Sequence, residues 1–129
     1  MTRVILDASA LLALLLNEPG AGDTAMAMDD GGTVICAANL AEVVGRLALL
    51  GNPATRIRAV LEPLELEVIS VDEDLALRAG LMAPAAKSLG LSLADRLCLA
   101  TAERLGGTAL TADRIWLKWK GKAKVVCIR

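Results

Sequence analysis

The chain has 129 residues, enough for one domain with a substantial core and too few for two. Hydrophobic residues make up 55% of it and charged residues 22%, a balance that excludes a disordered chain. With 14 basic and 15 acidic residues the net charge is −1, so any nucleic-acid contact must come from a local patch. The chain has no histidine, which excludes histidine bases, histidine-activated nucleophiles and histidine-ligated zinc.

Cysteine usage and hydropathy indicate the compartment. Cys36, Cys98 and Cys127 each lie in an apolar run, and this odd, widely spaced set fits neither a disulfide framework nor a zinc ribbon. We expect three buried, reduced thiols and a reducing, cytoplasmic setting. The apolar run at residues 8–16 is too short to span a bilayer and follows Asp7, so we expect no membrane segment and no signal peptide.

In chain order, the first half alternates short apolar strands with helical stretches. Turn and helix-end signals separate these elements: Pro19, the Asp-Asp-Gly-Gly turn at 29–32 and Gly51-Asn52-Pro53. The predicted strands are residues 3–6 and 33–36, and the predicted helices are residues 9–16, 18–29, 39–50 and 54–61.

The second half continues the alternation. The helix predicted at residues 72–89 is opened by three acids and interrupted near Pro84. The other predicted helices are residues 92–105 and 112–119, and the predicted strands are residues 67–71, 108–110 and 124–128. Continuous apolar runs are typical of strands buried on both faces. We therefore predict one α/β domain over residues 1–129, with a parallel sheet of four to five strands flanked by helices.

Four acids fall where such a fold binds ligands, at the carboxyl edge of the sheet. Asp7 and Asp113 follow strands, and Glu42 and Asp95 lie in the first turns of helices that begin at that edge. Each position also has a purely structural interpretation. Asp7 and Thr111 can cap helices, Ser92 and Asp95 fit a capping box, and Asn39 and Glu42 come close to one.

If the four carboxylates converge, they require a cation. Two carboxylates about 5 Å apart at an effective dielectric of about 20 repel by roughly 3 kcal/mol, so four cannot all stay ionised unaided. An all-oxygen site without His or Cys suits Mg²⁺ or Mn²⁺. Because the chain has no histidine, water activated by the metal is the expected nucleophile.

Four segments carry a family resemblance that spans nearly the whole chain: VILDASALLALLLNEPG, AANLAEVVGRL, LSLADRLCLATA and ALTADRIW. In this order they resemble the PIN-domain ribonucleases and, within them, the VapC-type toxins of toxin–antitoxin pairs. The resemblance implies a PIN-like domain and a Mg²⁺- or Mn²⁺-dependent endoribonuclease that leaves a 5′-phosphate and a 3′-hydroxyl. It also implies an antitoxin partner and a homodimer.

The resemblance also assigns roles to individual residues. Asp7 and Asp95 would bind the principal metal, Glu42 would bind it directly or through water, and Asp113 would hold a water or a second metal. The last two assignments are interchangeable. The resemblance also implies a helper role for Ser9, Asn39 and Thr111, whose side chains would form hydrogen bonds to the metal-binding acids or to metal-bound water.

The segment RIWLKWKGKAK at residues 114–124 is the dense basic patch of the chain. It can neutralise RNA phosphates and stack a base, or it can be a solvated helix end whose tryptophans pack on the core. The RNA-binding candidates in it are Arg114, Lys118, Lys120 and Trp119. Arg96 and Arg114 lie next to the acids and either pair with them or contact the scissile phosphate.

Other functional classes stay open. A non-catalytic PIN-like binding module is the non-enzyme alternative, and metal titration separates it from the nuclease. A phospho-acceptor domain needs an acid pair after the first strand, and a haloacid-dehalogenase-type phosphatase needs an aspartate where Ser9 stands, so both fit less well.

Overall fold

A computed structural model describes residues 3–129 of the chain. Within them lies one five-stranded, all-parallel sheet with the strand order β3-β2-β1-β4-β5. This confirms the predicted α/β class and parallel sheet and decides the number of strands. The strands are β1 (Val4–Leu6), β2 (Thr33–Cys36), β3 (Glu67–Ile69), β4 (Thr108–Thr111) and β5 (Lys124–Cys127).

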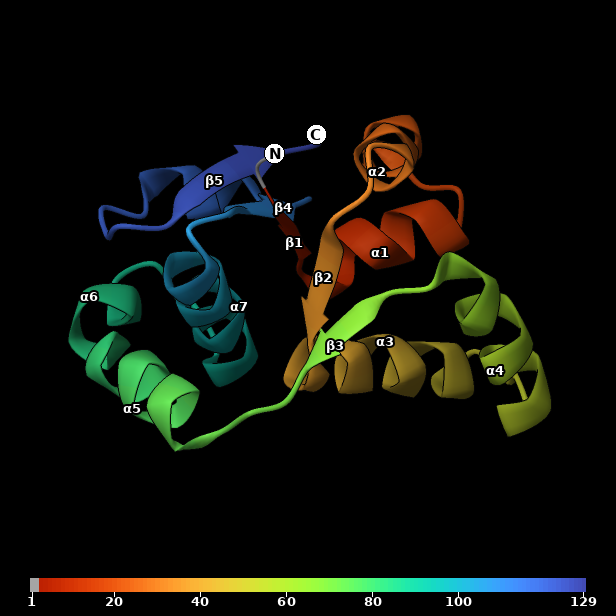
Figure 1. Ribbon diagram of the computed structural model, residues 1–129, viewed down its shortest axis with the longest axis horizontal. Coiled ribbons are helices and arrows are strands. Elements are labelled where there is room, and N and C mark those ends of the chain that lie inside the picture. The colour runs from red at the N-terminus through yellow and green to blue at the C-terminus, as the bar shows by residue number, and fades with distance from the viewer. Residues whose placement is uncertain (1–2) are drawn as a thin grey trace.

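Helices cover both faces of the sheet, and Figure 1 shows α5, α6 and α7 grouped on the side opposite α1 and α2. The α-helices are α1 (Ala8–Leu15), α2 (Ala21–Asp29), α3 (Ala37–Leu49), α4 (Ala54–Leu61), α5 (Glu73–Leu81), α6 (Ala83–Lys87) and α7 (Leu93–Leu105). Two short 3₁₀ helices are η1 (Glu62–Leu64) and η2 (Arg114–Lys118). In the part of the chain described, no helix is long and apolar enough to cross a membrane.

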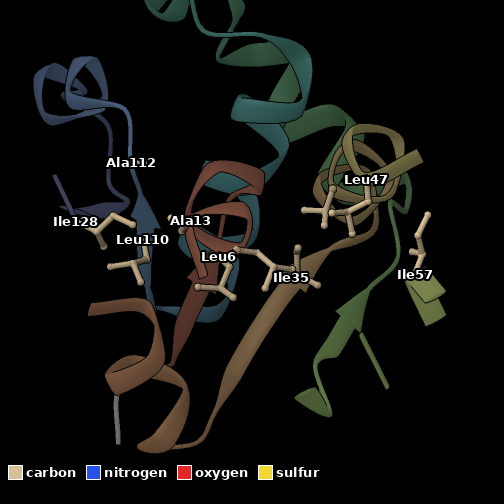
Figure 2. Packing of buried hydrophobic residues seen from close by; sticks show 11 residues of the cluster. Leu6, Ala13, Ile35, Leu47, Ile57, Leu110, Ala112 and Ile128 are labelled. Atoms are coloured by element: carbon tan, nitrogen blue, oxygen red, sulfur yellow. The ribbon is translucent and has the colours of Figure 1, made fainter. Parts of the chain in front are cut away.

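In the three central strands β1, β2 and β4, successive residues face opposite sides of the sheet, and both sides are core. Leu6, Ile35 and Leu110 pack against α1 and α3, as Figure 2 shows with Ala13 and Leu47. Their chain neighbours, the buried residues Ile5, Val34 and Ala109, pack with Cys98 and Leu99 of α7 and with Trp116. Burying each large apolar side chain contributes about 1.5–3 kcal/mol, which explains why the strands are continuously apolar.

The order of the strands reverses at the neighbouring strands β1 and β4, and the ligand-binding crevice of such folds lies beyond the carboxyl ends of these two strands. The chain builds outward from β1 to β2 and β3, then crosses the other face and returns as β4 on the far side of β1. The backbone N–H of Asp7, just after β1, donates to the carbonyl of Leu110 in β4 at 3.0 Å. Ligands of open α/β sheets bind where strand order reverses in this way, beyond the carboxyl ends of the strands.

Several predicted boundaries need correction. The helix expected at 72–89 is interrupted near Pro84 as predicted, because Pro84 lacks an N–H and occupies the first turn of the separate helix α6, but α6 ends at Lys87. The helix expected at 112–119 is the five-residue η2, capped by Asp113 and not by Thr111. Cys36 and Cys98 are buried as expected, whereas Cys127, on the edge strand β5, is only partly buried.

Candidate active site

The four predicted carboxylates line one pocket of about 330 Å³ at the carboxyl edge of the sheet. Asp7 enters from the β1–α1 junction, Glu42 from α3, Asp95 from the first turn of α7 and Asp113 from the end of β4. The four acids therefore line the same pocket, although they are spread over more than a hundred residues of sequence. Five further residues complete the lining: Ala8, Ser9, Leu12, Arg46 and Trp116.

Asp7 lies at the bottom of the pocket with only 4% of its surface exposed. Its Oδ1 accepts a hydrogen bond from the backbone N–H of Ala10 at 2.8 Å, so it caps α1 as predicted. Its Oδ2 accepts from the Thr111 hydroxyl at 2.6 Å, and the Ser9 hydroxyl lies 2.8 Å from both oxygens. These donors hold the carboxylate in one orientation.

Ser9 and Thr111 also join the ends of β1 and β4. Ser9 Oγ accepts from the backbone N–H of Ala112 at 2.9 Å, and Thr111 Oγ1 accepts from that of Asp113 at 3.1 Å. Asp113 Oδ1 in turn accepts from the N–H of Ile115 at 3.1 Å, which caps η2. The hydroxyls therefore couple the position of Asp7 to that of Asp113.

Asp95 is fixed by the capping box expected with Ser92. Its Oδ2 accepts from the Ser92 N–H at 2.9 Å, and its own N–H donates to Ser92 Oγ at 3.1 Å. The cap uses one carboxylate oxygen, and the side chain still lines the pocket. Capping and convergence are therefore compatible, because both place an acid at the positive end of α7.

Glu42 lies beside a buried amide. Because α3 begins at Ala37, Asn39 lies inside the helix and forms no capping box with Glu42. Its Nδ2 instead donates to the carbonyl of Ala94 at 3.1 Å and lies 3.5 Å from Glu42 Oε1. Asn39 is fully buried, and its Oδ1 has no hydrogen-bond partner within residues 3–129. A buried, unpaired acceptor at this place suits a bound water or ion.

Burial raises the pKa values of Asp7, Glu42 and Asp95, and a neighbouring acid adds to the rise in each case. Burial, partly offset by the hydrogen bonds from Thr111, Ala10 and Ser9, raises the pKa of Asp7 to about 6, and the charge of Asp95 adds to the rise. Desolvation first and Asp95 second raise the pKa of Glu42. Desolvation and Asp113 raise the pKa of Asp95, against the lowering effect of its bonds to Ser92. Asp95 is thus the electrostatic centre of the group.

The donor set fits a hard divalent cation by its chemistry. It consists of carboxylate oxygens alone, and desolvation together with neighbouring acids raises the pKa values of Asp7, Glu42 and Asp95. The side chains are not drawn together into a finished metal site, since no three acidic or thiol groups among residues 3–129 are already arranged around a common point. Asp7 and Asp95 are held by hydrogen bonds, whereas Glu42 lies exposed at the rim.

The predicted RNA-binding residues lie outside this pocket. Lys118, Lys120 and Trp119 line a second hollow of about 670 Å³ between η2 and α6. Trp116, one turn earlier, is buried and lines the acidic pocket, so η2 connects the two sites. Arg114 donates to the carbonyl of Arg129 at 3.3 Å and lines neither hollow.

Two basic residues differ from expectation. Arg96 neither pairs with the acids nor lines the pocket, because its guanidinium donates to the carbonyl of Ala79 at 2.9 Å. Arg46, which the sequence reading did not select, does line the pocket. Its spacing of four residues from Glu42 was the available signal, since residues i and i+4 share a helix face.

A family model and solved structures match this chain. The PIN domain model matches residues 4–122. A DNA-bound VapBC from Salmonella typhimurium is similar at 18% identity with a TM-score of 0.74, covering 100% of each chain. A toxin–antitoxin complex from Klebsiella pneumoniae is similar at 19% identity with a TM-score of 0.71, covering 98% of each chain. FitAcB from Neisseria gonorrhoeae is similar at 22% identity with a TM-score of 0.71, covering 97% of each chain. No curated protein matches the chain.

Proposed function

Because the chain belongs to the PIN-domain family, whose model matches residues 4–122, we propose that it is a Mg²⁺- or Mn²⁺-dependent endoribonuclease. The observation that supports this best is the convergence of four carboxylates from four separate elements on one pocket. The reaction is hydrolysis: water attacks the phosphorus atom, and the bond to the 3′ oxygen breaks. The products are a 3′-hydroxyl and a 5′-phosphate.

Asp7 and Asp95 are the residues proposed to hold the principal ion, and Glu42 and Asp113 are proposed to bind it through water or to hold a second ion. Such an ion, when bound, supplies neutralisation of the carboxylates and polarisation of a phosphate oxygen. Asp7 and Asp95 are suited to the first role because hydrogen bonds already orient their carboxylates.

Three neutral residues support the acids in this proposal. Ser9 and Thr111 keep Asp7 from rotating away from the pocket, because their hydroxyls lie 2.8 and 2.6 Å from its oxygens. Asn39 donates from its Nδ2 to Glu42 Oε1 at 3.5 Å and so helps to orient that carboxylate. Side chains held by such outer contacts keep ligands in place at little entropic cost.

The proposed setting is a toxin with an antitoxin partner and a homodimer. The solved structures from Salmonella typhimurium and Klebsiella pneumoniae are described as VapBC and toxin–antitoxin complexes. This chain also exposes large apolar side chains, which is typical of protein-binding surfaces. Leu49 is 85% exposed. An apolar hollow elsewhere on the surface is lined by residues that include Leu15, Leu47, Ile57 and Val60.

Cleavage of total tRNA by the purified, antitoxin-free protein tests the proposal. We expect cutting in Mn²⁺ or Mg²⁺ and none in EDTA, together with a rise in Tm on adding either metal, because ligands that bind the folded state stabilise it. Cutting that persists in EDTA would contradict the metal site. A protein that binds no metal and cuts no RNA would instead favour the non-catalytic binding module.

We propose that RNA leaves the acidic pocket along η2 and reaches Lys118, Lys120 and Trp119. Lys118→Ala with Lys120→Ala should weaken RNA binding and flatten its salt dependence, by about 0.7 in log–log slope for each lost phosphate contact. Fluorescence anisotropy of a labelled single-stranded RNA measures this slope. Arg56→Ala with Arg58→Ala removes equal charge from α4 and should leave the slope unchanged. If both double variants have the same salt-dependence slope, residues 118–120 do not contact RNA phosphates and have only a structural role.

A further inference from the structure

The acidic pocket has a strongly unbalanced charge. Four carboxylates line it, and Arg46 is the single basic side chain among the lining residues in the described part of the chain. An RNA strand brings a negative charge with each phosphate, so the carboxylates oppose its approach. A fixed cation on the pocket wall therefore has a strong influence on where a phosphate settles.

Arg46 is available for such a contact. It lies in the last turn of α3, one helical turn after Glu42, and its side chain is exposed. Within residues 3–129 its guanidinium forms no ion pair. Arg96, which follows Asp95 in the sequence, is by contrast engaged by the protein itself, because its guanidinium donates to the carbonyl of Ala79 at 2.9 Å.

We propose that Arg46 binds a non-bridging phosphate oxygen of the RNA strand in the acidic pocket and so positions the strand over the carboxylates, a role that rests on the proposed ribonuclease function. A guanidinium presents two parallel N–H groups that match two phosphate oxygens. Arg46 is a positioning residue in this scheme, and the carboxylates remain the metal-binding groups.

Steady-state cleavage of a short single-stranded RNA separates positioning from chemistry. For Arg46→Ala we expect KM to rise about tenfold, because a charge-assisted hydrogen bond is lost, while kcat changes by less than about threefold. Arg46→Lys keeps the charge but loses the paired donors, so its KM should lie between that of the wild type and that of Arg46→Ala. Arg58→Ala is the matched control, since Arg58 is equally exposed in the last turn of α4 and lines no acidic pocket; it should keep the wild-type KM.

Binding measured without cleavage tests the same contact independently of activity. In the Asp7→Asn background, anisotropy of the same RNA is recorded over a series of NaCl concentrations. Arg46→Ala should lower the log–log salt slope by about 0.7, the value for one phosphate contact on a single strand, and Arg58→Ala should not. An unchanged slope and KM in Arg46→Ala, beside a wild type that cleaves, would overturn the role of Arg46 and leave the nuclease standing. A wild type that neither binds nor cleaves RNA would overturn the proposed function itself, and with it the role of Arg46.

Discussion

Asp7→Asn is expected to abolish metal-dependent RNA cleavage while the fold is preserved. The substitution removes the charge of the most buried of the four carboxylates and keeps its shape. Losing about 4 kcal/mol of metal-derived transition-state stabilisation lowers kcat by about a thousandfold. Asparagine is as good a helix cap as aspartate, so the bond from the Ala10 N–H and the start of α1 should survive.

The measurement is the rate of tRNA cleavage in Mn²⁺ or Mg²⁺, with circular dichroism to verify folding. Asp30→Asn is the matched control, because Asp30 is an exposed acid just after α2 and lies outside the pocket. It should cleave like the wild type. A fully active Asp7→Asn would contradict the proposed metal site.

In the absence of metal, Asp7→Asn should also be more stable than the wild type at neutral pH. The folded pKa of Asp7 is about 6 against an ordinary value of 3.8, so the folded state holds its proton more tightly than the unfolded chain. The stability contributed by protonated Asp7 is present in full below about pH 4 and is lost as the pH rises through about 6. The loss at pH 7 amounts to about 2–3 kcal/mol, and asparagine, which does not ionise, avoids it.

Urea denaturation in EDTA, at a series of pH values from about 4 to about 7, measures this difference. Subtracting the free energy of unfolding of the wild type from that of Asp7→Asn leaves the contribution of Asp7 together with its coupling to Asp95. The difference should increase from low pH to neutral pH. A difference that does not vary with pH would show that the pKa of Asp7 is not raised in the folded state.

Metal should reverse the order of stability of these two proteins. A divalent ion neutralises the carboxylates of the wild type and stabilises its folded state by mass action. Asp7→Asn lacks one proposed ligand and should gain much less from the same metal. The burial of a charged Asp7 that weakens the metal-free protein is thus the same feature that a bound cation would offset.

Much of the fold could be predicted because its signals are local. The apolar runs of β2 and β4 are bounded by turn residues, and α4 lies at residues 54–61 as expected, after Pro53. The cap of α7 could be predicted from Ser92 and Asp95, because a capping box involves residues only three apart. Local hydrogen bonding and hydropathy act within a few residues, which is the range that a sequence pattern covers.

The errors also have local causes. The expected interruption near Pro84 is confirmed, but α6 ends at Lys87 and not at Leu89, because Gly90 in a left-handed conformation closes the turn that follows. The segment after Asp113 has a helical pattern but only five residues of helix, and short turns of this kind adopt 3₁₀ geometry. Asn39 was placed in a cap, yet α3 starts two residues earlier and encloses it.

The sequence by itself determined which acids could meet, because parallel strands and the helices that follow them present Asp7, Glu42, Asp95 and Asp113 at the same edge of the sheet. Only the tertiary structure decided how they meet. It holds Asp7 between the hydroxyls of two residues from opposite ends of the chain. Among residues 3–129 it leaves the buried amide oxygen of Asn39 without a hydrogen-bond partner. It also places Arg46 in the lining of the pocket, whereas Arg96 is bound to the carbonyl of Ala79. These features depend on distances between elements far apart in sequence, which packing of the core sets and no local pattern encodes.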